Sequence, residues 1–122
     1  DLQMPAFTAK YRVLRYDRRG HGKSAVPNGP YNMEMLGRDA LAVLDGLGIQ
    51  KANWLGLSMG AMEGMCLGAN AGNRVDKIIL SNTSTYYADK TIWHNRMDAV
   101  SKAGSVAAIA DIFWATKGGR PS

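Results

Sequence analysis

A serine between two glycines is the feature of this sequence most able to do chemistry. The segment Gly-Leu-Ser-Met-Gly at positions 56–60 follows an apolar run and precedes a helix-like stretch. In that setting the pattern G-x-S-x-G is typical of a nucleophile elbow, a turn so sharp that side chains at its two glycine positions would collide with backbone. We therefore predict that Ser58 is a nucleophile for acyl transfer. We also predict that the backbone N–H of Met59 stabilises the negative charge that develops on the attacked carbonyl oxygen.

The spacing of later glycines separates this motif from a chance match. Glycine is common, with 14 in 122 residues, but after the serine it recurs every fourth position, at 60, 64, 68 and 72. On a helix these glycines form one ridge, and each interior glycine costs roughly 1 kcal/mol of helix propensity. We predict that the ridge lets the helix lie close to a sheet. A membrane G-x-x-x-G interface is the alternative, but Glu63, Asn70 and Arg74 interrupt the apolar run that it needs.

Strands and helices alternate around the serine. The sequence predicts strands over Tyr11–Tyr16, Ala52–Leu57 and Val75–Ser81, and helices over Met33–Leu47 and Met59–Ala71. Asn32 is the expected N-cap of the first helix, and Gly48 its stop. This order indicates an α/β fold in which three parallel strands are joined by right-handed crossover helices.

The pattern changes after Ser81. A polar linker over Ser81–Thr85 leads to segments with helical patterns only, over about Lys90–Lys102 and Ser105–Ala115, with a break at Gly104. We therefore predict two parts, a partial core over residues 1–81 and the start of a helical cap, or lid, over residues 82–122.

Composition excludes several classes of function. An apolar content of 46% and a charged content of 20% are ordinary for a soluble domain. The net charge is +5, but no base-stacking aromatic pattern accompanies the basic residues, so we expect a solvated or anion-attracting rim and no nucleic-acid surface. A single cysteine, Cys66, permits no intrachain disulfide and no metal-ligand spacing, which favours the reducing cytoplasm. We expect no metal, no cofactor and no membrane partner.

The first loop contains a rival motif. Positions 17–24 end in Gly-Lys-Ser, as a phosphate-binding P-loop does, and positions 20–25 match a dinucleotide fingerprint. Both motifs require a helix to begin at this point, and Pro27 and Pro30 prevent it; the P-loop also requires glycine where Asp17 stands. We therefore interpret the loop as structural and His21 as a turn residue.

Together, the loop and the serine motif resemble two motifs of the α/β-hydrolases. Tyr-Asp-Arg-Arg-Gly-His-Gly-Lys-Ser at 16–24 is similar to the D-x-R-G-x-G-x-S loop of that superfamily, and the elbow follows it. Within the superfamily the sequence is most similar to 3-oxoadipate enol-lactonases, over residues 11–24, 29–31, 80–83 and 93–96. Neighbouring esterases and perhydrolases share the first two motifs, so they stay as alternatives.

The resemblance implies a serine hydrolase that opens an anionic enol-lactone to 3-oxoadipate during bacterial degradation of aromatic compounds. The free carboxylate of that substrate would need a cation in the cap. Trp93 and Arg96 lie three positions apart on one predicted helix face, where they would supply an apolar wall and an ion partner. Cap packing for Trp93 and solvation for Arg96 are the open alternatives.

Partners for Ser58 are not evident in the sequence. In these hydrolases the nucleophile is followed by an acid and then a histidine. The later part of this chain has one histidine, His94, within the predicted cap. We therefore expect the chain to be the central part of a family member and to be catalytically inert on its own.

Overall fold

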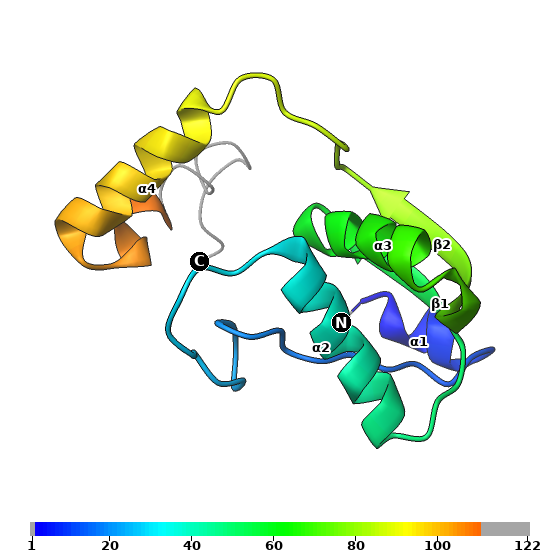
Figure 1. Cartoon of the computed structure of the whole chain (residues 1–122). Helices are drawn as coiled ribbons and strands as arrows, with labels where there is room; N and C mark the ends of the chain where they lie inside the picture. The colour runs from blue at the N-terminus through cyan, green and yellow to red at the C-terminus, as the bar shows by residue number, and fades with distance from the viewer. Residues whose placement is uncertain (1, 111–122) are drawn as a thin grey trace. The chain divides into compact units, whose positions relative to one another are not determined.

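A computed structural model describes residues 2–110, which form two short parallel strands and several helices (Figure 1). The elements are α1 (Met4–Thr8), α2 (Met33–Gly46), β1 (Ala52–Leu57), α3 (Met59–Asn70), the 3-10 turn η1 (Gly72–Arg74), β2 (Val75–Ser81), α4 (Thr91–Ala103) and the 3-10 turn η2 (Val106–Ile109). The chain divides into two compact units, with the boundary between Thr85 and Tyr86.

The predicted elements around the serine are confirmed, and local signals explain where they begin and end. Both β1 and β2 have the predicted bounds, and α2 and α3 each end one residue earlier than predicted. The side chain of Asn32 accepts a hydrogen bond of 2.8 Å from the backbone N–H of Met35, as an N-cap does. Gly48 has a φ of 68°, which favours glycine and stops the helix.

The predicted strand over Tyr11–Tyr16 is wrong. The sheet has two strands, β1 and β2, which pair in parallel with Leu57 opposite Ser81. The segment over Tyr11–Tyr16 is no strand, although its residue types suit one. An extended segment becomes a strand only when its backbone pairs with a neighbour, and residue types alone do not determine that pairing.

Helix α3 packs closely on one face of the sheet because two of its glycines leave room. A Cβ added to Gly64 would lie 2.5 Å from a Trp54 ring carbon, and one added to Gly68 would lie 2.8 Å from the Ile78 side chain. Gly72, the last member of the predicted ridge, lies in η1 with no neighbour this close. The predicted packing ridge is therefore confirmed at Gly64 and Gly68.

Helix α3 also packs against α2, and the core is formed by these two helices and the sheet. Its buried members are Ala40, Leu67 and Val75, with Tyr16, Leu41 and Trp54 packed around them. The face of the sheet turned away from α3 is open and apolar: Leu57 is 62% exposed and Ile79 is 58% exposed. No helix between residues 2 and 110 is long and apolar enough to cross a membrane.

The second unit contains α4 and η2. The predicted break at Gly104 is confirmed, since this residue is left-handed with a φ of 65° and ends α4. The predicted helix over Ser105–Ala115 begins instead as the 3-10 turn η2, whose N-cap Ser105 accepts a hydrogen bond of 3.1 Å from the N–H of Ala107. Positions 111–115 of that prediction lie outside the described residues.

Candidate active site

Ser58 occupies a sharp turn between β1 and α3. Its φ of 55° and ψ of −116° are unusual for a residue with a side chain, and such strain persists only where the surroundings impose it. Its N–H donates a hydrogen bond of 2.9 Å to the carbonyl of Ser81, which ties the turn to the end of β2. Its carbonyl accepts from the N–H groups of Ala61 and Met62, at 3.0 and 3.1 Å, which begin α3.

The hydroxyl of Ser58 is not used for capping. A serine at a helix N-cap usually accepts a hydrogen bond from an amide of the first turn. Here Ser58 is the N-cap of α3, yet its side chain makes no capping hydrogen bond and the residue is exposed. The backbone therefore presents this hydroxyl at the surface of the first unit.

The two glycines that flank the serine meet across the turn. Gly56 is buried, and a Cβ added there would overlap the backbone carbonyl of Gly60. The indole N–H of Trp54 donates a hydrogen bond of 2.9 Å to that same carbonyl. The predicted collision with backbone is therefore confirmed at Gly56. It is wrong at Gly60, where an added Cβ would meet no backbone and would lie 3.2 Å from the Arg18 side chain.

The residue after β2 also has a strained backbone, as Ser58 does after β1. Ser58 and Asn82 are the two non-glycine residues with positive φ within the described range, and Asn82 has a φ of 49°. Each directly follows the carboxyl end of a strand, and these ends lie side by side in the parallel pair. Ligands of open α/β sheets bind outside this edge.

The amide predicted to stabilise an oxyanion opens α3. Met59 is the first residue of that helix and is partly buried. The first amides of a helix have no partner within it, and the helix dipole adds positive potential there. An anionic oxygen beside Ser58 would therefore be stabilised by this helix end.

The loop before α2 is structural, as predicted. Its Asp17 carboxylate accepts a hydrogen bond of 2.9 Å from the backbone N–H of Lys23, and a Cβ on Gly22 would collide with that carboxylate. After this loop no helix begins until Met33, so the structure lacks the helix that both nucleotide-binding motifs require at this point.

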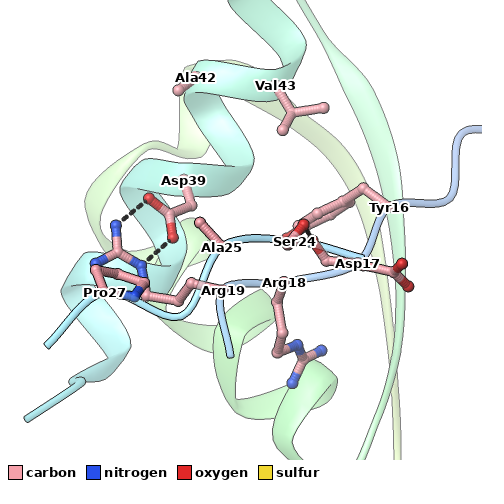
Figure 2. A pocket seen from close by; sticks show the side chains of 10 residues that line it. All are labelled: Tyr16, Asp17, Arg18, Arg19, Ser24, Ala25, Pro27, Asp39, Ala42 and Val43. Atoms are coloured by element: carbon pink, nitrogen blue, oxygen red, sulfur yellow. Dashed lines mark hydrogen bonds and ion pairs between the residues drawn. The ribbon is translucent and has the colours of Figure 1, made fainter. Parts of the chain in front are cut away.

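An arginine of this loop, Arg19, connects it to α2. Arg19 donates hydrogen bonds of 2.5 and 2.6 Å to the two carboxylate oxygens of Asp39, and Figure 2 shows the two groups facing one another. These bonds hold the pKa of the Asp39 carboxyl below its ordinary value. The shallow pocket beside them is lined by Tyr16–Arg19, Ser24, Ala25, Pro27, Asp39, Ala42 and Val43, and Ser58 is not among these residues.

A buried carboxyl group on α3 was not predicted from the sequence. Glu63 has 0% exposure, its Oε1 accepts a hydrogen bond from the Tyr16 hydroxyl, and its Oε2 lies 3.4 Å from the guanidinium of Arg18. Burial raises the pKa of Glu63 above its ordinary value, although Tyr16 and Arg18 act in the opposite direction. The available signal was a lone charge between Gly60 and Gly64 on an otherwise apolar helix.

This raised pKa predicts how the stability of a Glu63→Gln variant depends on pH. The native protein holds the Glu63 proton more tightly than the unfolded chain, so the stability from this group is lost as pH rises from the unfolded value, about 4.3, through the native value. Glutamine does not titrate. In thermal unfolding series, the variant should gain stability relative to the parent as pH rises above about 4. Asp39, whose pKa is lowered, is present in both proteins, so its contribution to the stability difference between them cancels. If that difference stays constant or shrinks as pH rises, the raised pKa of Glu63 is contradicted.

The second unit brings the two predicted cap residues together. Trp93 and Arg96 both lie on α4, and the Arg96 guanidinium carbon is 5.1 Å from the centre of the Trp93 ring. Tyr87 packs edge-on against the same ring, with centroids 5.9 Å apart. His94 is exposed on this helix. Within the described part of the chain, no group of three or more His, Cys, Asp or Glu side chains is placed to hold a metal ion.

Comparisons with known proteins agree with this architecture. The family model for the alpha/beta hydrolase fold matches residues 3–103. The chain is 37% identical, over 95% of its length, to 3-oxoadipate enol-lactonase 2 of Acinetobacter baylyi. Among solved structures it is similar to a hydrolase from Pseudomonas aeruginosa, with a TM-score of 0.87 and 42% identity over 93% of the chain. It is also similar to the enol-lactonase from Burkholderia xenovorans LB400, with a TM-score of 0.84 and 39% identity over 91% of the chain.

The chain is short beside these proteins. It spans 44% of the length of the Acinetobacter enzyme, 43% of the Pseudomonas structure and 42% of the Burkholderia structure. The matched region includes the turn at Ser58 and the whole segment that forms α4.

Proposed function

This chain belongs to the α/β-hydrolase fold family, and from that premise we propose that the natural protein carrying it is a serine hydrolase that opens 3-oxoadipate enol-lactone. Ser58 is the proposed nucleophile, and the N–H of Met59 contributes to the oxyanion hole. The observation that carries the proposal is the strained turn at Ser58, which exposes a serine without a capping bond at the carboxyl end of β1.

The proposed reaction has two steps. The hydroxyl of Ser58 gives its proton to a histidine base and attacks the lactone carbonyl. The ring ester bond then breaks to leave an acyl-enzyme, the released enol oxygen takes the proton from the histidine, and the enol tautomerises to the ketone. Water then attacks the acyl-enzyme and releases 3-oxoadipate. In this family the acid and the histidine follow the nucleophile along the sequence. We propose that residues beyond this chain supply them, so that the 122-residue piece alone is inert.

The direct test is the rate at which the natural protein opens the enol-lactone, compared with a neutral lactone and a p-nitrophenyl ester. An enol-lactonase prefers the anionic lactone in kcat/KM. A preference for neutral esters would instead favour one of the related esterase activities, and no turnover of any of the three would contradict the proposal.

We further propose that the second unit is the start of a cap that recognises the substrate. The ring of Trp93, which is 44% exposed, forms an apolar surface, and the adjacent Arg96 carries the positive charge that a carboxylate needs. Contact with the ring restricts the guanidinium group, which lowers the entropy lost on binding.

Replacing Arg96 tests this recognition. Arg96→Ala should lower kcat/KM for the anionic lactone about ten- to a hundredfold more than for a neutral ester, because a charge-assisted hydrogen bond is lost. Arg96→Lys should recover part of the loss, since lysine keeps the charge without the planar fork. Lys102→Ala, which removes an exposed cation from the same helix, is the matched control. Equal losses on charged and neutral substrates would mean that Arg96 only supports the fold of the cap.

A further inference from the structure

The second glycine of the elbow is enclosed on three sides. The carbonyl of Gly60 accepts from the indole of Trp54 at 2.9 Å, and Gly56 packs against that carbonyl so closely that no Cβ would fit. On the third side the guanidinium of Arg18 lies 3.2 Å from the position that a Cβ on Gly60 would occupy. Trp54 and Gly56 belong to β1, so Arg18 is the neighbour of Gly60 that comes from outside the strand and the helix.

Arg18 is held in this place by Glu63. The carboxylate is completely buried on α3, one turn beyond Gly60, and its Oε2 makes no hydrogen bond but lies 3.4 Å from the Arg18 guanidinium. Its other oxygen is held by the hydroxyl of Tyr16. A buried carboxylate is costly to keep, and a role in specifying one local arrangement is a known reason for its retention.

Arg18 and Arg19 are adjacent but have different tasks. Figure 2 shows the Arg18 side chain leaving the loop in another direction from that of Arg19, which faces Asp39 on α2. In the loop pattern D-x-R-G-x-G-x-S, Arg19 occupies the arginine position and Arg18 the unspecified one. The motif therefore does not indicate the contact between Arg18 and the elbow.

We propose that Arg18 and Glu63 are positioning residues for Ser58: Glu63 holds Arg18 against Gly60, and this contact helps to keep the turn at Ser58 in its strained conformation. The inference rests on the proposed function, in which Ser58 is the nucleophile. Strained backbone at a site persists when its surroundings over-determine it, and Arg18 supplies one of these constraints. Neither residue touches the substrate in this proposal.

The test compares Arg18→Met with Arg19→Met in the natural protein. Both variants exchange an arginine of the same loop for an uncharged side chain, and each breaks one ion pair to a different helix. Two properties are measured: hydrogen exchange of the backbone amides of residues 59–62, and the rate at which a fluorophosphonate labels Ser58. Labelling needs no knowledge of the natural substrate.

Arg18→Met should speed exchange of these amides and slow labelling of Ser58, each by about ten- to a hundredfold, because a displaced nucleophile loses its alignment. KM should change less than kcat. Arg19→Met should leave both elbow readouts within about twofold of the parent, whatever its effect on overall stability. Arg18→Lys should restore part of the labelling rate. Adding Glu63→Gln to Arg18→Met should cause little further loss, since both act through one contact.

Equal effects of Arg18→Met and Arg19→Met on the elbow would overturn the inference, because the ion pairs would then only hold the loop. Unchanged exchange in Arg18→Met would also overturn it. If the parent protein is not labelled at Ser58, the proposed nucleophile fails, and the exchange comparison alone decides whether Arg18 constrains the turn.

Discussion

Ser58→Ala in the natural protein is expected to lower kcat for the enol-lactone by at least about a thousandfold, because acyl transfer loses its nucleophile while binding groups stay in place. A fluorophosphonate should label the parent at Ser58 and should not label the variant. Ser101→Ala, which removes an exposed serine of α4, is the control and should keep the parental rate. Substantial turnover by Ser58→Ala would remove the basis of the proposed mechanism.

Ser58→Gly separates loss of chemistry from loss of folding. Glycine adopts a φ of 55° without the steric cost that a side chain carries, so this variant should be inactive and yet more stable than the parent, by about 1 kcal/mol. Denaturant unfolding measures that difference. A variant that is both inactive and strongly destabilised would show that the serine has a structural role.

Gly56→Val should be the most destabilising single change in the first unit. Even a Cβ at this buried position overlaps the backbone carbonyl of Gly60, and backbone cannot move aside as a flexible side chain can. We expect a loss of about 3 kcal/mol in the free energy of unfolding, at the upper end of ordinary overpacking. Labelling of Ser58 should fall as well, because the turn must open to admit the side chain.

Gly46→Ala is the matched control for that substitution. Gly46 is the last residue of α2, and a Cβ there meets nothing within 4 Å. Alanine should therefore be neutral or should stabilise by about 0.4 to 1 kcal/mol, through the lower entropy of the unfolded chain. If Gly56→Val proves as harmless as Gly46→Ala, the two glycines of the elbow are not in the close contact described above.

Short-range patterns in the sequence determined much of the first unit. The helical period of α2, the cap at Asn32 and the stop at Gly48 act within a few residues, and the structure has all three. The turn at Ser58 is also local, because it depends on small residues two positions before and after the serine. These features can be predicted from sequence since the groups that interact are close together in the chain.

Only the tertiary structure decided which distant residues meet. Tyr16 and Glu63 are 47 positions apart, and Arg19 and Asp39 are 20 positions apart, so no periodic pattern connects either pair. The predicted strand over Tyr11–Tyr16 failed for the same reason: a strand needs a partner, and its residue types do not specify one. Whether a buried charge such as that of Glu63 is costly or useful depends on the groups that the fold brings around it.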